Sequence, residues 1–148
     1  MDSKAEQAQS LKLFIVLNRA LQSITNRVKE NIKTYGLNPT EFAVLELLYH
    51  KGDQPIQKIG DKVLLASGSI TYVVDKLETK ELLQRKPCPN DRRVTYAAIS
   101  EIGIQLMDNI FPKHMAAIHE ILGGLSYEDK ALVIDKMKEL GIFASEFK

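Results

Sequence analysis

Apolar residues recur every three or four positions along most of this chain, which is the spacing that places them on one face of an α-helix. The first such stretch, residues 11–33, is apolar on two sides. Its central stripe is Leu13, Leu17, Leu21, Ile24 and Val28, and Phe14, Ile15, Val16 and Ala20 widen it. Because a helix with two apolar sides needs two partners, we expect one side to face the core. A second subunit is the candidate for the other side.

The second expected helix has clear start and stop signals. Asn38 is the expected N-cap, Pro39 suits the first helical position, and Glu41 completes a capping box. The apolar face that follows is Phe42, Leu45, Leu48 and Tyr49. Gly52 suits a left-handed cap at the end of this helix.

Two more helices with a short turn between them form a helix-turn-helix pattern. We expect Gln54-Pro55 to open the shorter helix. The longer helix is expected to run from Ser67, its N-cap, to about Lys80. The apolar positions of the two helices are Ile56, Ile59, Val63, Ile70, Val73, Val74 and Leu77.

A β-hairpin pattern follows, with strands expected at 82–86 and 94–99. Because proline lacks an N–H group, Pro87 and Pro89 are expected to keep the intervening loop out of the paired ladder. Ser100 and Ser126 then suit the N-caps of two final helices. The expected order is α-α-α-α-β-β-α-α, a mainly α fold in which a small β-hairpin wing completes a winged helix-turn-helix.

Length and charge favour one domain with a nucleic-acid partner. A chain of 148 residues with 45% hydrophobic residues is long and apolar enough for one core. The net charge is only +1, but residues 51–93 contain nine Lys/Arg against six Asp/Glu. This basic excess lies on the winged segment and favours DNA as the partner. A solvated surface of mixed charge is the alternative.

Several other classes of protein are disfavoured. No apolar run approaches the roughly 20 residues of a membrane span, and the polar N-terminus does not resemble a signal peptide. The single cysteine, Cys88, excludes an intrachain disulfide, so we expect a cytoplasmic protein without a membrane partner. His114 and His119 lie about 140° apart around a helix, so no metal site is expected. Without a recognisable catalytic or phosphate-binding motif, we expect neither an enzyme nor a cofactor.

Three segments are the most distinctive: LNPTEFAVLELL in the second helix, SGSITYVVDKLETKELLQR from the fourth helix into the first strand, and NDRRVTYAAISEIG through the hairpin. They resemble the MarR family of bacterial transcriptional regulators. Asp91-x-Arg93 matches the family's wing signature. Around the fourth helix and the hairpin, the chain is similar to the quinone-responsive repressors of Gram-positive bacteria.

The resemblance implies a single MarR-type domain over residues 1–148. Its winged helix-turn-helix would occupy 37–99, and 5–35 and 100–146 would form the helical dimerisation region. Such a homodimer would bind a pseudo-palindromic operator in double-stranded DNA, act as a stress-response repressor, and be released by a small phenolic or quinone effector. An activator, and a winged-helix module that binds protein without sequence-specific DNA binding, are the alternatives.

Candidate DNA contacts lie on the fourth helix and the wing. By resemblance, Arg93 enters the minor groove and Asp91 orients it through a charge-assisted hydrogen bond. The helix offers hydroxyl groups but no side chain suited to bidentate base reading. The candidate DNA-binding residues are Ser67, Ser69, Thr71, Tyr72, Lys76, Arg85, Asp91, Arg92 and Arg93, with Lys58, Lys62 and Lys86 as further basic candidates. For Tyr72, packing against the protein is the alternative.

Two kinds of effector site fit the sequence. Cys88 lies between two prolines of the wing, where Lys86 and Arg92 would make its thiol more reactive, and modification would place bulk at the DNA contact. An incidental surface thiol is the alternative. By resemblance, a ligand would bind where the dimer arms meet the winged region. Candidate lining residues are Phe14, Tyr35, Phe42 and His50, although core packing explains these side chains more simply.

One position departs from the family pattern. The family usually has glycine after the recognition helix, in a Lys-Gly-Leu sequence, whereas this chain has Lys80-Glu81-Leu82. If the backbone at Glu81 is left-handed, glutamate costs on the order of 1 kcal/mol relative to glycine. We therefore expect either a different helix end or a mildly strained turn.

Overall fold

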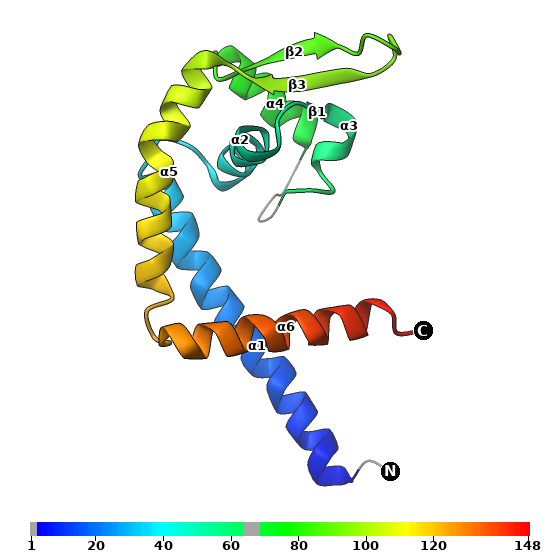
Figure 1. The fold of residues 1–148 in the computed structure, drawn as a ribbon, viewed down its shortest axis with the longest axis vertical. Coiled ribbons are helices and arrows are strands. Elements are labelled where there is room, and N and C mark those ends of the chain that lie inside the picture. Colours follow the sequence, from blue (N-terminus) through cyan, green and yellow to red (C-terminus); the bar gives the residue numbers. More distant parts are fainter. Residues whose placement is uncertain (1–2, 64–68) are drawn as a thin grey trace.

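The computed structural model describes residues 3–63 and 69–148 and is mainly helical. Its helices are α1 (Lys4–Lys33), α2 (Pro39–Lys51), α3 (Ile56–Ile59), α4 (Ile70–Thr79), α5 (Glu101–Ile121) and α6 (Tyr127–Ser145), and its strands are β1 (Gln54–Pro55), β2 (Leu83–Pro87) and β3 (Thr95–Ile99). The sheet and α2–α4 form one end of the molecule, and α1 and α5 extend away from it toward α6 (Figure 1). The expected winged helix-turn-helix with helical arms is confirmed.

The first helix begins seven residues earlier than the apolar pattern indicated, at Lys4, with Ser3 as its N-cap. Residues 4–10 contain no large apolar side chain, so hydrophobic spacing gives no signal there, although Ala, Glu, Gln and Lys are good helix formers. The second helix is confirmed in detail. Both hydrogen bonds of the capping box between Asn38 and Glu41 are present, and Gly52 has a positive φ of 79°.

Gln54-Pro55 precedes a helix as expected, since Pro55 is the N-cap of α3, but the sequence did not predict that the same two residues form a strand. These two residues form β1, which pairs antiparallel with β3, so the hairpin becomes a three-stranded sheet of order β1-β3-β2. An edge strand tolerates proline because one of its sides makes no ladder bonds. A strand of two residues is too short to produce an alternating pattern, so it could not be predicted from the sequence. Helix α3 is correspondingly short and ends before Val63.

The prediction that Pro87 lies outside the ladder was wrong. Strands β2 and β3 pair antiparallel from Leu83 opposite Ile99 to Pro87 opposite Thr95. Because β2 is the other edge strand, the missing N–H of Pro87 is tolerated. We use the name wing for residues 83–99. Beyond the ladder, the Cys88 amide donates to the carbonyl oxygen of Val94 at 3.0 Å, which closes the loop.

The fourth helix begins two residues later than expected, since Ser69 is its N-cap and accepts a hydrogen bond from the Tyr72 amide. Ser67 lies outside the described residues. At the other end, Glu81 has a φ of 64° and is the only non-glycine residue with positive φ among those described. The Leu82 amide donates to Leu77 and the Glu81 amide donates to Glu78, both at 2.9 Å. This pair of bonds is a Schellman motif, with glutamate in its left-handed position.

The turn after α4 also contacts the start of α5. The Ser100 amide donates to the Leu82 carbonyl oxygen at 3.0 Å, and the Ser100 hydroxyl donates to the Glu81 carbonyl oxygen at 2.7 Å. One turn later, a Cβ atom at Gly103 would lie 2.2 Å from the Leu82 carbonyl oxygen, so this close approach requires glycine. The end of the recognition helix, the end of the wing and the start of α5 are therefore packed tightly together.

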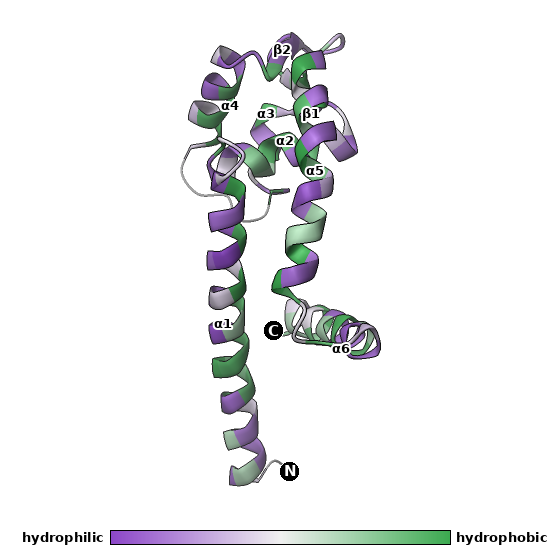
Figure 2. Cartoon of the chain, turned by 90° about the vertical axis from the view of Figure 1, so that its left-hand side faces the viewer, coloured by the Kyte–Doolittle hydropathy of each residue, from purple (hydrophilic) through white to green (hydrophobic). Residues whose placement is uncertain are grey.

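One core joins the winged end to the upper part of α1 and α5. Its fully buried side chains include Ile32, Leu45, Leu48, Ile59, Leu77 and Met107. By contrast, the N-terminal half of α1 and most of α6 carry apolar side chains that the single chain leaves exposed, visible as green segments in Figure 2. Within residues 3–63 and 69–148, no helix has the length and apolar character needed to span a membrane.

Candidate nucleic-acid interface and ligand cavity

The recognition helix α4 presents polar side chains to solvent beside the wing. Tyr72 is 62% exposed, which argues against the alternative that it packs into the protein. The Lys76 ammonium lies 5.8 Å from the centre of the Tyr72 ring, within the range of a cation–π contact. Ser69 and Thr71 are exposed at the start of the helix. The helix therefore offers hydroxyl groups and one cation, as the sequence indicated.

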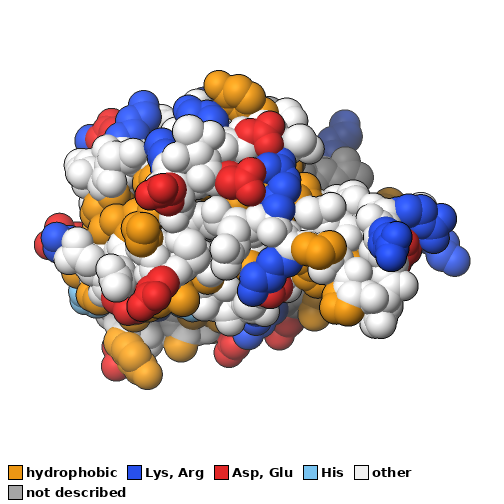
Figure 3. All heavy atoms as spheres, turned by 90° about the horizontal axis from the view of Figure 1, so that it is seen from above, with side chains coloured by type: hydrophobic (Ala, Val, Ile, Leu, Met, Phe, Trp, Pro, Cys, Tyr) orange, Lys and Arg blue, Asp and Glu red, His pale blue; other side chains and the backbone are white. Residues whose placement is uncertain are grey.

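The wing loop presents Arg93 in a fixed orientation. Its side chain is 90% exposed. Two guanidinium nitrogens donate to the two carboxylate oxygens of Asp91, at 3.1 and 3.2 Å. These hydrogen bonds from Arg93 hold the pKa of Asp91 below its usual value, so its carboxylate stays charged. Lys and Arg side chains gather at the projecting end of the wing (Figure 3).

The other basic residues of this region differ in how they are held. Arg92 is exposed at the loop tip. Arg85 is only 30% exposed and forms ion pairs with Asp75 and Glu78 of the recognition helix. Hydrogen bonds to these two carboxylates raise the pKa of Arg85, with the bond to Asp75 as the main cause. The sequence placed Arg85 among the DNA contacts, whereas the structure brings it against α4.

Two further lysines also have protein partners. Lys86 lies 4.0 Å from the Asp53 carboxylate, and the Lys62 ammonium donates to the Gln54 side chain at 2.7 Å. Lys58 is exposed on α3.

Cys88 is half-buried at the base of the wing loop.

A buried carboxylate ties the recognition helix to α2. Glu41 is 2% exposed and accepts a hydrogen bond from the Lys80 ammonium at 2.8 Å, in addition to its capping bonds. Burial raises the pKa of Glu41, but the hydrogen bonds from the Asn38 backbone and from Lys80 outweigh this, and the net shift is downward. Sequence reasoning assigned Glu41 only to the capping box. Its link to Lys80 joins residues 39 positions apart, which no local pattern indicates.

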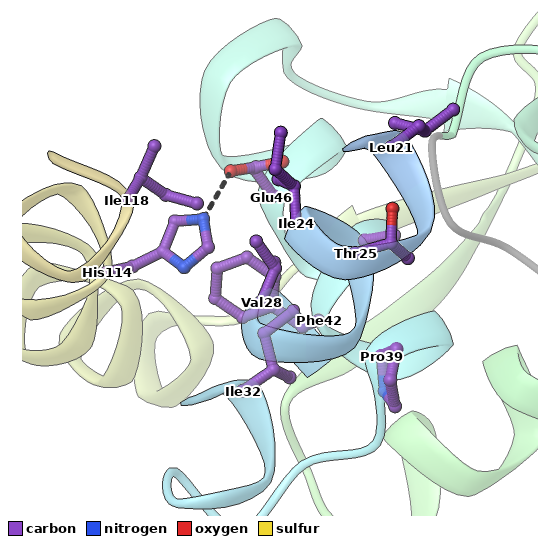
Figure 4. A pocket seen from close by; sticks show the side chains of 11 residues that line it. Leu21, Ile24, Thr25, Val28, Ile32, Pro39, Phe42, Glu46, His114 and Ile118 are labelled. Atoms are coloured by element: carbon purple, nitrogen blue, oxygen red, sulfur yellow. Dashed lines mark ion pairs between the residues drawn. The ribbon is translucent and has the colours of Figure 1, made fainter. Parts of the chain in front are cut away.

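A cavity of about 480 Å³ lies between α1, α2 and α5 (Figure 4). Its walls are mostly apolar, and Thr25, Glu46 and His114 supply the polar groups. This combination is typical of sites for small apolar ligands that carry one or two hydrogen-bonding groups. The apolar part of the lining is Leu21, Ile24, Val28, Ile32, Pro39, Phe42, Ala43 and Ile118.

The polar groups of the cavity are incompletely paired. His114 Nε2 lies 4.0 Å from a Glu46 carboxylate oxygen, and among the described residues its buried Nδ1 atom has no hydrogen-bond partner. Burial lowers the pKa of His114 and raises that of Glu46. The long separation and the lowered pKa of His114 favour a neutral imidazole over an ion pair. The Phe42 ring lies 4.6 Å from the His114 ring, centre to centre.

The sequence predicted the lining of this cavity only in part. Phe42 lines it, and Tyr35 lies behind Phe42 with 6.2 Å between ring centres. His50 instead packs on Phe111, and Phe14 is 64% exposed on α1. Glu46 and His114 were missed, because they come from different helices and His114 was considered only as a metal ligand.

These features define a winged-helix DNA-binding transcriptional regulator with a ligand-sized cavity beside its winged region. Residues 37–95 match the family model described as "MarR family". The HTH-type transcriptional regulator MhqR of Bacillus subtilis is 61% identical over 94% of this chain and 96% of its own length. The chain therefore belongs to the MarR family.

Two further comparisons agree with this assignment. The uncharacterized HTH-type transcriptional regulator YkoM of Bacillus subtilis is 40% identical over 95% of this chain and 91% of its own length. Among solved structures, the MarR family regulator Sco3205 of Streptomyces coelicolor, in complex with DNA, aligns with a TM-score of 0.77. That alignment covers 95% of this chain and 92% of Sco3205 at 15% identity, so it shows a shared fold.

Proposed function

We propose that this protein is a homodimeric repressor that binds a pseudo-palindromic operator in the cytoplasm and is released by a small phenolic or quinone effector. The observation that carries the DNA-binding part is the exposed Arg93, held by Asp91 at the tip of a wing that projects beside the recognition helix. Arginine suits a narrow minor groove because its charge meets enhanced negative potential there.

In this proposal, α4 enters the major groove. Ser69, Thr71 and Tyr72 face the base edges and phosphates, and Lys76 contacts the backbone. Arg92 and Arg93 follow the adjacent minor groove. Two copies would place their recognition helices about 34 Å apart, one turn of DNA. The exposed apolar side chains of α1 and α6 support a second copy, because a monomer rarely exposes so much apolar surface.

The cavity between α1, α2 and α5 is the proposed effector site. A volume of about 480 Å³ accommodates a single substituted aromatic ring. The ring would pack against Phe42 and the aliphatic side chains of α1, and a phenolic hydroxyl would donate to the neutral His114 or to the Glu46 carboxylate. Since α1 and α5 are the arms and α2 belongs to the winged region, a ligand here would favour a different arm angle and weaken operator binding.

A covalent route through Cys88 is the second candidate. Its thiolate would add to a ring carbon of a quinone and form a C–S bond. The proton lost from the thiol and the proton then lost from that ring carbon would end on the two quinone oxygens, which leaves a hydroquinone thioether on the wing. Its position at the base of the wing loop favours this route, because added bulk there would obstruct the minor-groove contact.

The test begins with selection of bound fragments from genomic DNA, followed by titration of the best fragment with a methylhydroquinone and with the matching benzoquinone. We expect tight, salt-sensitive binding to a palindromic site that both compounds weaken. His114→Leu should keep operator affinity but lose the response, while Cys88→Ser should keep both. Loss of the response in Cys88→Ser, with a normal response in His114→Leu, would assign sensing to the thiol. Retention of no fragment would favour the protein-interaction alternative.

A further inference from the structure

The recognition helix carries two acidic side chains on the side that faces the wing. Asp75 and Glu78 are three positions apart and therefore lie on the same face of α4. Their carboxylates are 57% and 42% exposed. Negative charge on a surface that must approach DNA phosphates weakens binding unless a cation neutralises it. Direct DNA contact therefore does not explain why α4 carries these two carboxylates.

Arg85 of β2 contacts both carboxylates. One guanidinium nitrogen donates to Asp75 at 2.5 Å and the other terminal nitrogen donates to Glu78 at 2.6 Å. Arginine can do this because its planar group presents several donors in a fixed fork, which lysine lacks. We use the name Arg85 cluster for Arg85, Asp75 and Glu78. The cluster joins the first strand of the wing directly to the recognition helix.

The Arg85 cluster differs from the ion pair at the wing tip. Arg93 pairs with a residue two positions away in its own loop, so that bond orders only the loop. Arg85 pairs with residues seven and ten positions earlier, on another element. Its side chain is 30% exposed, whereas that of Arg93 is 90% exposed. Arg93 can therefore reach a phosphate without breaking a contact between two elements. Arg85 could reach one only by giving up its ion pairs with α4.

An open pocket of about 370 Å³ lies between the wing, α3 and the start of α4, and Arg85, Ile70, Thr71 and Thr95 are among its lining residues. Buried Leu77 of α4 and Leu83 of β2 belong to the common core, so apolar packing brings the two elements together. The ion pairs of the Arg85 cluster add a directional, charged connection between α4 and β2 to this packing.

We propose that Arg85 is a positioning residue, which fixes the angle between wing and recognition helix, and that Asp75 and Glu78 serve to hold it. This inference rests on the proposed DNA binding and gives Arg85 a different role from the DNA contact that the sequence led us to expect. With the cluster intact, the major-groove and minor-groove contacts keep a fixed spacing. Without it, the wing samples several angles, and operator binding weakens although no phosphate contact is removed.

The test compares variants in operator titrations over a range of salt concentrations. Asp75→Asn should weaken binding about fivefold, since exposed ion pairs contribute little individually. If Asp75 were only a surface charge, its removal would tighten DNA binding. The direction of the change in affinity therefore distinguishes this role from a role in holding Arg85. Asp61→Asn, which removes an exposed charge from the same region, should leave binding unchanged or tighter.

Two arginine variants complete the comparison. Arg85→Lys keeps the charge but not the fork, so it should also weaken binding about fivefold without changing the salt slope. Arg93→Ala should flatten that slope by about one unit. In the Asp75→Asn background, Arg85→Lys should cost little more, because both changes disrupt the same cluster. Tighter or unchanged binding by Asp75→Asn, or full affinity in Arg85→Lys, would overturn the proposal.

A measurement on the protein without DNA tests the positioning role independently of the proposed function. Amide hydrogen exchange in residues 83–99 should be faster in Asp75→Asn than in the wild type or in Asp61→Asn, because the wing is less restrained. Unchanged exchange would refute the positioning role even if no operator were found. If the wild-type protein bound no DNA while exchange changed as expected, only the proposed function would fail.

Discussion

Glu81 adopts a left-handed backbone conformation that is unfavourable for a residue with a side chain. Its φ of 64° lies in the region where a side chain clashes with the backbone, and the Schellman bonds around it require that conformation. The Ser100 hydroxyl also donates to the Glu81 carbonyl oxygen, so the turn is fixed from both sides. The departure from the family's glycine could be read from the sequence, but only the structure shows that the strained alternative is the one adopted.

Replacement of Glu81 by glycine should therefore stabilise the protein. We expect Glu81→Gly to raise the free energy of unfolding by about 1 kcal/mol, measured by urea denaturation, because the steric cost of the left-handed conformation disappears. Thr79→Gly is the control. Thr79 is the last residue of α4, where glycine relieves no strain and its low helix propensity lowers stability. An unchanged or lower stability in Glu81→Gly would show that the turn is not strained.

The elements that the sequence predicted well are those with local signals. Asn38 and Ser100 mark helix starts by side-chain caps, and both caps are present. The pairing of Asp91 with Arg93 was also expected, by resemblance to the family's wing signature, and both of its hydrogen bonds are present. The sequence did not predict three other contacts, namely the Arg85 cluster, the Glu41–Lys80 bond and the Glu46–His114 pair. Each joins separate elements, and neither periodicity nor capping rules specify which distant side chains meet.

The link between α2 and α4 should make stability depend on pH. Glu41 has a lowered pKa in the folded chain, so its contribution is present above the unfolded value of 4.5 and is lost as pH falls through the folded value. We expect Glu41→Gln to reduce the free energy of unfolding at pH 7 by about 1–3 kcal/mol. The stability curves of variant and wild type should converge in acid.

A matched surface pair provides the control for this prediction. Glu30 pairs with Arg27, and both side chains are mostly exposed. Glu30→Gln should therefore change stability by less than about 0.5 kcal/mol at any pH. Parallel curves for Glu41→Gln and wild type between neutral and acid pH would contradict a stabilising role for the ionised Glu41.

At the scale of the whole molecule, the arms carry more apolar surface than one chain can bury. Phe143 is 69% exposed on α6 and Leu13 is 46% exposed on α1. The N-terminal half of α1 and the whole of α6 lie outside the core of the winged end (Figure 2). Exposed apolar surface of this extent marks an association site, and a second copy of this chain is the proposed occupant.

Charged substitutions on this surface should separate the subunits. We expect Phe143→Glu combined with Leu13→Glu to give a monomer by sedimentation at micromolar concentration, where the wild type sediments as a dimer. Operator affinity should fall with it, since a monomer engages one half-site instead of two. Lys29→Glu, a change at an exposed position in the C-terminal half of α1, is the control. A wild-type chain that sediments as a monomer would contradict the dimer proposal itself.

The wing passes into the arm through a single residue, Ser100, between β3 and α5. With 21 residues, α5 is about 30 Å long. A tilt of about 10° at Ser100 would therefore move the far end of α5 by about 5 Å. The winged region and the wall of the cavity that α5 provides are thus joined through one residue and one helix. If the proposed effector binds in the cavity, a displacement of α5 by a few ångströms would be enough to change the orientation of the wing.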